Sequence, residues 1–496
     1  MSLFRQLTPV KIVLLAATLV GVFFVVYSPH FSYPFPFHID EWHHIDQSIL
    51  LGSYGDYFDR LRVDLEARPN SFEIGFHLFL LLLSLIVNVP TTLQFMPGLW
   101  AVLTASVLFY TTYKLTRGNF LAAWLAIIFF ASIKSNVNLT GLWFFTPLTF
   151  AAPFLFLYMY LFSEGLLRQD KRMVLGSLAI MVFLIPTHSV SLLFALPALT
   201  MYGLFYWRYI LSEWKFFWIF LVIPVAGFIF FKDALGLAWG EAFVHFAQGI
   251  QFPYGWGVLE LNNSLFEVYT LVGVVFAFAG VVLITMKPER WRFLLYLLWP
   301  LNAFILIVLF RATGISFLAP FQRNLYYLAL GLPVLSGVGA AHLITFTSEQ
   351  FKRFLSSAKD IEYITKVLTV GVVMVTVLFS FVSYYEVPAG LELYQPINKA
   401  DYAALQFLAQ QPPGHVLASP FVSTAVFSVS GMRPLATVFF DSQFRGITEQ
   451  FFVVDCEQKN ALLQGVEERL YIISQRALTC GWNTIYNDDD YIYQIN

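Results

Sequence analysis

Charged residues are scarce in this sequence, because Asp, Glu, Lys and Arg together make up only 12% of its 496 residues. The 29 basic and 31 acidic residues nearly balance and form no long basic run, so nucleic acid is not an expected partner. Only two cysteines are present, Cys456 and Cys480, which excludes cysteine redox chemistry in the apolar part of the chain. They form either one late disulfide or a buried free pair. A glycine-rich phosphate loop, internal repeats and low-complexity segments are also absent.

Hydrophobic residues dominate instead. They make up 58% of the sequence, and aromatic residues 18%, with a mean hydropathy of +0.68 that lies far outside the soluble range. A membrane-spanning helix takes roughly 20 residues. Apolar runs that approach this length occur at residues 10–27, 72–88, 92–113, 119–133, 146–162, 173–187, 189–207, 216–232, 264–286, 291–310, 321–346 and 364–385. We therefore expect an integral, multi-pass membrane protein in contact with membrane lipids.

Lysine and arginine near the ends of short loops mark the cytoplasmic side of such a protein. They cluster here as Arg5 with Lys11, Lys114 with Arg117, Arg168 with Lys171 and Arg172, Arg208 with Lys215, Lys287 with Arg290 and Arg292, and Lys352 with Arg353. All clusters share one side only if one apolar run does not cross. Run 72–88 is the best candidate, because it is short and carries Glu73 and His77 in its first turns. The pattern predicts about eleven transmembrane helices, a cytoplasmic N-terminus and an exoplasmic C-terminus.

Two domains are expected from the change in composition along the chain. Residues 1–390 would form an all-α membrane domain with a first exoplasmic loop at 28–71, and residues 391–496 a small exoplasmic α/β accessory domain. In the tail, "ADYAALQFLAQ" has helical spacing, whereas "HVLASP", "RLYIISQ" and "DDDYIYQIN" have the patterns of short strands. An oxidising compartment would favour a bridge between the two cysteines.

The stretch "HIDEWHHID", residues 38–46, gathers three carboxylates and three histidines just after the first apolar run. If it is helical, Asp40, His43 and His44 share one face. Adjacent carboxylates such as Asp40 and Glu41 raise each other's pKa, so that one can act as a base while the other holds a partner. With imidazole they are also ligands for zinc or a harder divalent ion. The alternative is a polar juxtamembrane loop that Trp42 anchors at the headgroups.

Nearly all other unexplained polar residues also fall on the predicted exoplasmic side, which indicates a membrane enzyme with its active site there. Arg323 lies at the edge of a loop and Arg311 ends the preceding helix. Guanidinium groups grip phosphate through two hydrogen bonds, although interfacial arginines also anchor helix ends. His188 follows Thr187 at a predicted turn, as a site residue or as a hydrogen-bonded core histidine.

These features resemble the GT-C superfamily of membrane glycosyltransferases, which use sugars linked to polyprenyl phosphate. The resemblance rests on the Asp40-Glu41 pair after a first transmembrane helix, on about eleven spans and on a small exoplasmic C-terminal domain. It implies that the first-loop acid, matched by Asp40 and Glu41, serves as the catalytic base or holds the acceptor or a metal. The segment "PFQRNLYYLALGLPVLSGVG" is similar to a late helix that opens with an arginine near the donor phosphate, the role implied for Arg323. "PTHSVSLLFALPAL" resembles a turn where some members use a histidine as a zinc ligand, which implies that role for His188.

Two departures from the oligosaccharyltransferase branch narrow the expectation. "NKADYAALQFLAQQPPGHVLASP" is similar to the start of the soluble domain in its catalytic subunits, but "FVSTAVFSVSG" stands where a tryptophan-rich acceptor motif would follow, which argues against sequon glycosylation. "KSNVNLTGLWFFTP" contains no acid where a second acidic motif would lie. The cofactor is therefore either none or a divalent metal. Zinc held by Asp40 or Glu41 with His188 fits better than a magnesium or manganese site built from acids of both loops.

The expected function is transfer of a sugar from a polyprenyl-phosphate or pyrophosphate donor to a glycan, lipid or protein acceptor on the exoplasmic side, with inversion. Asp40 and Glu41 would be catalytic, Arg323 and Arg311 would bind the donor phosphate, and the acceptor or a metal would be oriented by His43, His44 and His188. The alternative is a transporter or flippase for a lipid-linked glycan. Transporters keep charges near the bilayer midplane in paired repeats, whereas the predicted helix interiors here are almost free of charge.

Overall fold

The computed structural model describes residues 7–52, 73–135, 141–253, 264–351, 358–384, 395–437, 448, 450–464 and 469–495. The second part of the predicted first loop and the predicted domain boundary at residue 390 lie outside these residues. The described residues form two compact units. Unit 1 comprises those within 1–28, 58–76 and 96–387, and unit 2 those within 29–57, 77–95 and 388–496. The predicted division of the chain at residue 390 stays a prediction.

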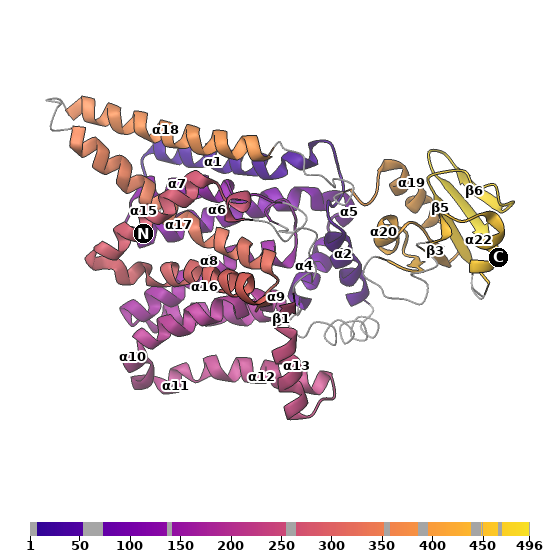
Figure 1. Cartoon of the computed structure of the whole chain (residues 1–496), viewed down its shortest axis with the longest axis horizontal. Helices are drawn as coiled ribbons and strands as arrows, with labels where there is room; N and C mark the ends of the chain where they lie inside the picture. Colours follow the sequence, from indigo (N-terminus) through magenta and orange to yellow (C-terminus); the bar gives the residue numbers. More distant parts are fainter. Residues whose placement is uncertain are drawn as a thin grey trace. The chain divides into compact units, whose positions relative to one another are not determined.

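Unit 1 is a bundle of apolar helices joined by short connections (Figure 1). The predicted apolar runs in this unit all coincide with helical structure. Its described helices are α1 (Pro9–Tyr27), α6 (Met96–Leu115), α7 (Phe120–Ala131), α8 (Pro147–Arg168), α9 (Lys171–Phe205), α10 (Trp207–Ser212), α11 (Trp214–Phe217), α12 (Ile219–Ala234), α13 (Trp239–Gly249), α14 (Leu265–Val268), α15 (Leu271–Met286), η4 (Pro288–Phe293), α16 (Leu294–Thr313), α17 (Phe321–Phe351) and α18 (Ala358–Tyr384). Two short strands, β1 (Gln251–Pro253) and β2 (Ile315–Phe317), pair antiparallel.

The lengths of these helices identify a multi-pass membrane protein. Of the described residues, six segments are long and apolar enough to cross a membrane: Pro9–Phe31, Val89–Leu115, Pro147–Arg168, Lys171–Phe205, Arg290–Thr313 and Phe321–Phe351. Helices α7, α12 and α15 are shorter, with 12, 16 and 16 residues, so helix length does not establish the predicted count of eleven. Many outward side chains are large and apolar, such as Val13, Phe278 and Leu301, which suits contact with lipid tails.

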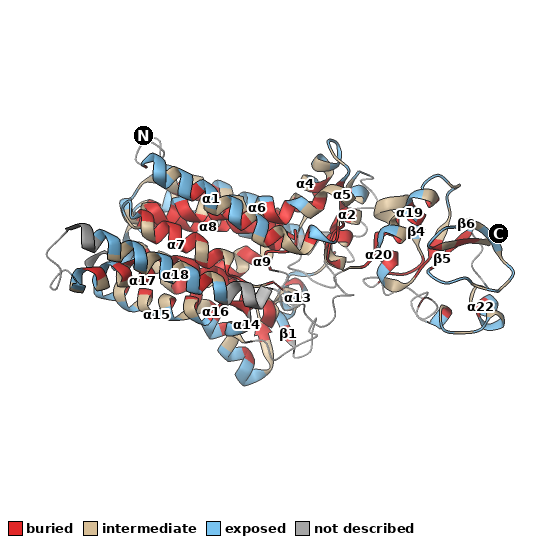
Figure 2. Cartoon of the chain, turned by 90° about the horizontal axis from the view of Figure 1, so that it is seen from above, coloured by how far each residue is buried: buried red, intermediate tan, exposed pale blue. Residues whose placement is uncertain are grey.

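Helix α17 forms the centre of unit 1, and it contacts α7, α15, α16 and α18. Most of its 31 residues are buried, whereas much of α1 is exposed (Figure 2). Glycines let its neighbours approach closely. A Cβ at Gly337 would lie 2.4 Å from the carbonyl oxygen of Ala122 in α7, and a Cβ at Gly339 would lie 2.1 Å from that of Phe276 in α15. Small residues at such contacts are the usual means of tight helix packing in membranes.

One buried ion-pair network ties α8 to η4. The Glu164 carboxylate is only 1% exposed, and Arg168 donates to it from one turn later at 2.5 Å. Arg292 donates to the same carboxylate at 3.3 Å and to the carbonyl oxygen of Leu115 at 3.4 Å. A buried carboxylate needs such partners because burial without them costs several kcal/mol. The network therefore fixes the ends of three segments, α6, α8 and η4.

Unit 2 combines a five-stranded sheet with helices from both ends of the chain. The strand order is β4 (Arg433–Pro434), β3 (His415–Leu417), β5 (Leu470–Ser474), β7 (Tyr491–Ile495) and β6 (Asn483–Asn487). Strand β3 runs parallel to β4 and β5, whereas β7 is antiparallel to β5 and β6. The described helices are η2 (Ser28–Phe31), α2 (Ile39–Leu51), α5 (Val89–Thr92), η3 (Leu93–Phe95), α19 (Lys399–Leu408), α20 (Pro420–Ser430), α22 (Cys456–Leu462) and part of α4 (Ile74–Ser84). The helix and the three strands predicted in the tail are confirmed.

The early segment of the chain folds onto the tail in this unit. Helix α2 contacts α20 (Figure 1), and the Ser428 hydroxyl donates a hydrogen bond to the Asp46 carboxylate. The Tyr33 hydroxyl donates to the carbonyl oxygen of Ile397 at 2.8 Å. Residues separated by more than 360 positions are therefore neighbours, and α2 is part of the same compact body as the sheet.

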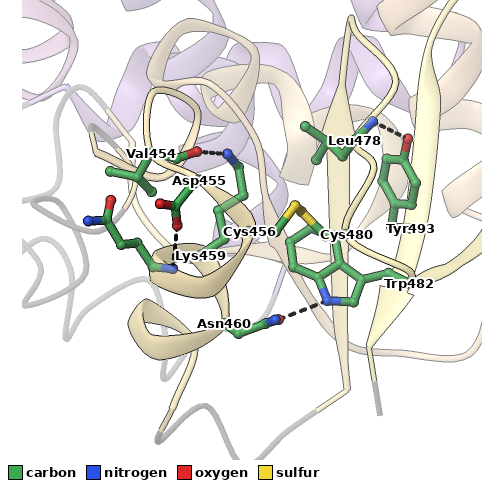
Figure 3. Close-up of a disulfide and its surroundings, with 10 residues drawn as sticks. Val454, Asp455, Cys456, Lys459, Asn460, Leu478, Cys480, Trp482 and Tyr493 are labelled. Carbon is green, nitrogen blue, oxygen red and sulfur yellow. Dashed lines mark hydrogen bonds between the residues drawn. A yellow bond between two sulfur atoms is a disulfide. The ribbon is translucent and has the colours of Figure 1, made fainter.

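Cys456 and Cys480 form a disulfide, with Cα atoms 5.2 Å apart. Figure 3 shows the bridge joining the start of α22 to the segment before β6. Beside it, the Trp482 indole donates to the Asn460 side chain at 3.0 Å. Of the two arrangements that the sequence leaves open for these cysteines, the structure contains the bridge.

Replacing Gly339 by alanine tests the packing of α17. The added Cβ would collide with the α15 backbone, so we expect a loss of at least ~2 kcal/mol of stability from overpacking. Gly371→Ala in α18 is the matched control, because no atom lies within 4 Å of its Cβ position. Thermal unfolding in detergent should show a clear drop in Tm for Gly339→Ala only. Equal Tm values for the two variants would contradict this packing.

A pair of buried aspartates in unit 2 predicts a dependence of stability on pH. Burial, followed by the neighbouring Asp401 carboxylate, raises the pKa of Asp490 to about 7. The folded state therefore keeps a proton that the unfolded chain releases near pH 4, so this group's stabilising contribution is lost as the pH rises from about 4 through 7. Asp490→Asn should raise the Tm at pH 8 but not at pH 4. Asp488→Asn, an exposed control, should change neither value when both are followed by calorimetry.

Candidate functional site

The start of α17 is fixed by hydrogen bonds in the turn that follows β2. The Asn324 amide donates to the Ser316 hydroxyl at 2.9 Å and to the carbonyl oxygen of Ala319 at 3.2 Å. These buried groups hold the first turn of α17 against β2 and so determine where the half-buried Arg323 lies. Gln322 beside it is 2% exposed, and its Nε2 has no hydrogen-bond partner among the described residues. The helix therefore begins with a guanidinium and an amide donor.

Helix α9 is broken at His188, where the backbone is extended (φ −162°, ψ 81°) and two helices meet. Pro186 lies two residues before the break, and its missing N–H and its ring weaken the helical turn that precedes it. The turn predicted at Thr187 and His188 is thereby confirmed. Such a break puts polar backbone and a histidine inside an otherwise apolar helix, which is tolerated where the surrounding protein supplies partners.

A hydrogen-bonded chain links this break to α17. The His188 Nδ1 lies 2.7 Å from the Ser191 hydroxyl, which in turn lies 2.8 Å from the Tyr327 hydroxyl. Phe194 stacks on the Tyr327 ring, with centroids 4.1 Å apart. The charge of Arg323 acts on both His188 and Tyr327. The contact of Nδ1 with Ser191 thus orients the buried His188 ring, so that its Nε2 lies on the side away from Ser191.

Glu73 is the acid on the Nε2 side of the His188 ring. Its Oε1 lies 4.0 Å from the His188 Nε2. Gly75 makes this approach feasible, because a Cβ there would lie 2.6 Å from the Thr187 hydroxyl oxygen. From the sequence alone, Glu73 indicates only that its segment does not cross the membrane, and no site role is predicted for it. The sequence signal that points to a site role for Glu73 is its position as an acid in a nearly uncharged apolar run.

Arg311 ends α16 beside the start of α17. It is exposed, and its guanidinium carbon lies 4.7 Å from the centre of the Phe321 ring, a cation–π geometry. Arg311 and Arg323 therefore stand at the two sides of the β2 turn. Their predicted role as donor-phosphate ligands stays a prediction.

In unit 2, "HIDEWHHID" forms the first turns of α2, as its predicted helical spacing requires. Glu41 is 1% exposed, and its Oε2 accepts hydrogen bonds from the backbone N–H groups of Phe37 at 2.8 Å and His38 at 3.0 Å. The His38 ring in turn accepts from the N–H of Asp40 at 3.0 Å, which completes a capping box. Glu41 therefore closes the helix start, whereas the half-buried Asp40 carboxylate lies 3.4 Å from His38 Nδ1. The catalytic role of both acids stays a prediction.

His44 and His77 meet in the same unit, with 3.1 Å between Nδ1 of the first and Nε2 of the second. Burial, followed by the nearby His43, lowers the pKa of His77 to about 3, so its ring is neutral and able to ligate at neutral pH. Zinc–nitrogen bonds of about 2.0–2.1 Å place two nitrogen ligands roughly 3.3 Å apart, close to this separation. His44 and His77 supply imidazole nitrogens, a donor type that zinc binds. His44 is one of the residues predicted from sequence to orient the acceptor or a metal. The predicted metal ligands, Asp40, Glu41 and His188, stay a prediction.

No family model and no curated protein sequence matches this chain. Several solved structures do match this chain. An oligosaccharyltransferase of Archaeoglobus fulgidus, tethered to an acceptor peptide, matches 93% of this chain and 69% of its own at 11% identity and a TM-score of 0.56. ArnT of Cupriavidus metallidurans, bound to undecaprenyl phosphate, matches 97% of both chains at 15% identity and a TM-score of 0.53. The archaeal enzyme in complex with zinc and sulfate matches 92% and 68% at 12% identity and a TM-score of 0.50.

Both similar proteins are membrane glycosyltransferases of one superfamily. This chain shares its fold with these two proteins. The resemblance drawn from the first-loop acids and the late helix is thereby confirmed at the level of the fold.

The GT-C fold of this chain distributes the predicted site residues over its two units. Unit 1 brings His188 into one polar network with Glu73, Ser191 and Tyr327, for which the sequence predicts no site role. Arg323 lies near enough for its charge to act on His188 and Tyr327. Unit 2 carries Asp40, Glu41, His43 and His44 on α2. Tyr327 and Ser191 gave no separate signal, because a tyrosine and a serine inside apolar helices are common.

The capping role of Glu41 predicts a specific loss of local stability. Glu41→Ala would leave two backbone N–H groups without their acceptor, at a cost of about 1–2 kcal/mol. Hydrogen exchange should therefore speed up at residues 37–42 in this variant. Asp40→Ala keeps the Glu41 hydrogen bonds and should retain slow exchange there. Protection that survives in Glu41→Ala would show that the carboxylate does not hold the helix start.

Proposed function

We propose that this protein transfers a sugar from a polyprenyl-phosphate-type donor to a hydroxyl acceptor on the exoplasmic side of the membrane, with inversion at C1. The observation that carries the proposal is the start of α17. There Arg323, the buried amide of Gln322 and the N-terminus of α17 lie together, next to the His188 network. The N-terminus of a long helix favours a bound phosphate through its unsatisfied N–H groups and the helix dipole, and an arginine there adds a positive charge.

In this proposal Asp40 removes the proton from the acceptor hydroxyl while its oxygen forms a bond to C1. The bond between C1 and the phosphate oxygen breaks on the opposite face, and polyprenyl phosphate leaves with the bonding electrons. Arg323 neutralises the charge that grows on this leaving group, and Arg311 provides a second cation at the same turn. Glu73 and His188 hold the neighbouring hydrogen-bond network in register. Glu41 keeps α2, and with it Asp40, in its helical position.

A zinc ion is compatible with the His44–His77 pair of unit 2, because the His77 ring is neutral and the two ring nitrogens lie 3.1 Å apart. One structure of the similar archaeal enzyme contains zinc. Bound there, the ion would act as a Lewis acid toward an oxygen ligand. Magnesium and manganese prefer oxygen donors, so two imidazoles favour zinc over them.

The donor is bound through its phosphate and its lipid in this proposal. Guanidinium recognition of phosphate is bidentate, and the apolar, outward-facing surface of the late helices suits an extended hydrocarbon chain. The similar ArnT structure contains undecaprenyl phosphate, which supports a polyprenyl carrier. The acceptor is a hydroxyl-bearing molecule in this proposal, since "FVSTAVFSVSG" stands where a tryptophan-rich sequon-recognition motif would lie.

The test is release of polyprenyl phosphate from labelled polyprenyl-phosphate sugars by purified protein in lipid. We expect Asp40→Asn to lower kcat by roughly 10²-fold or more, because a general base contributes that much. Arg323→Ala should lower kcat by about 10²–10³-fold through loss of leaving-group stabilisation. Arg290→Ala, an exposed arginine that contacts Trp291 in η4, is the control and should keep full turnover.

Equal release by wild type and both variants would remove Asp40 and Arg323 from the mechanism. No release with any donor, while a labelled lipid still crosses the vesicle membrane, would replace the enzyme by a transporter.

A further inference from the structure

Unit 2 contains a cavity of about 230 Å³ that the proposed mechanism does not use. It lies among α2, the end of α4, the connection to α5, and helices α19 and α20. Its polar lining consists of Ser48, Ser84, Asn88, Tyr402, Gln406 and Ser428, and the remaining wall is made of isoleucine, valine and proline side chains. All lining residues belong to unit 2, so the cavity is a feature of one compact body.

The walls of this cavity are held together by contacts across the unit. The Ser428 hydroxyl donates to Asp46, which joins α20 to α2. Tyr402 packs on Phe35, with ring centroids 4.8 Å apart, which joins α19 to the segment before α2. The Asn88 side chain accepts from the N–H of Thr91 at 3.3 Å and so caps α5. A preformed, braced cavity costs a ligand little ordering entropy.

The lining carries hydrogen-bonding groups but no charged residue. The Ser48 and Ser84 hydroxyls donate to carbonyl oxygens of their own helices, each at 2.7 Å, so their lone pairs remain available as acceptors. The Asn88 oxygen is occupied by its cap, which leaves the amide nitrogen as a donor. A ligand with several hydroxyl groups matches such a mixture of donors and acceptors. A phosphate or carboxylate would find no opposite charge there.

The size and the apolar wall of the cavity restrict further which ligands it can bind. The cavity is smaller than the roughly 300–1,000 Å³ of sites that enclose drug-sized molecules. One sugar ring is of suitable size, whereas a peptide or an oligosaccharide would have to extend beyond the cavity. The apolar side chains and the Tyr402 ring can cover the C–H face of a pyranose while the amides and hydroxyls bind its rim.

We propose that this cavity binds one neutral sugar unit of the acceptor, so that the acceptor is a glycan or a glycosylated lipid. Binding of the sugar stands on the cavity alone, whereas its assignment to the acceptor rests on the proposed function. Unit 2 then acts as the acceptor-holding body of the enzyme, and the cavity sets which terminal sugar is extended.

Binding is measured first, on the full-length protein in lipid nanodiscs. Saturation-transfer NMR is recorded with neutral methyl glycosides of glucose, galactose, mannose and N-acetylglucosamine, and with glucuronate and glucose 6-phosphate as charged probes. We expect saturable binding of at least one neutral glycoside and none of the charged sugars. Binding of charged sugars only, or of no neutral glycoside, would overturn the proposal.

Three variants locate the bound sugar. Gln406→Ala removes one amide from the cavity and should weaken binding about five-fold. Ser84→Phe should fill the cavity from its exposed rim and abolish binding. Gln410→Ala, on an exposed glutamine outside the cavity, should bind as wild type. Equal affinity in all variants would place the sugar elsewhere and reject the cavity as its site, and Gln406→Ala decides this even if Ser84→Phe fails to fold.

Turnover then separates the two proposals. If donor cleavage is active, Gln406→Ala should raise the KM for a glycan acceptor and leave kcat unchanged, and an unchanged KM would reject the assignment to the acceptor. If no donor is cleaved by wild type, the proposed function fails and the acceptor assignment fails with it. The glycoside measurements would still show whether the cavity is a sugar site.

Discussion

The close packing of α17 is the constraint on which the rest of unit 1 depends. Gly331 meets Trp299 in α16, Gly337 meets Ala122 in α7 and Gly339 meets Phe276 in α15, each at a separation that leaves no room for a Cβ. Lipid gives helices no hydrophobic driving force for association, so the stabilisation must come from dispersion contacts between closely fitting helices. Because the helix is fixed on three sides, its first turn and the groups it carries have a defined position.

Polar residues enter this bundle where a helix starts or breaks. Arg323 stands at the beginning of α17, Glu73 directly precedes α4, and His188 lies at the break in α9. An unbroken apolar helix satisfies its own backbone and offers a ligand nothing, whereas a break frees N–H and C=O groups that polar side chains can join. The hydrogen bonds from His188 through Ser191 to Tyr327 stabilise one such break and at the same time orient a histidine.

Unit 2 is assembled from segments that lie far apart in the sequence. The loop helix α2 packs on α20, and the tail is closed by the bridge between Cys456 and Cys480. This arrangement ties the acids of "HIDEWHHID" to a sheet formed by the last hundred residues. It also creates the neutral cavity, since no single segment supplies more than part of its lining.

The sequence by itself determined the membrane class, the positions of the long apolar helices, the tail strands, the turn at His188 and the resemblance to the GT-C fold. These follow from composition and local periodicity, which act within a few residues. Glu41 accepts hydrogen bonds from two backbone N–H groups within four residues of it, and its predicted catalytic role stays a prediction. The partners of Glu73, the meeting of His44 with His77 and the cavity against α20 were decided only by tertiary structure, because each depends on residues brought together by packing over tens to hundreds of positions.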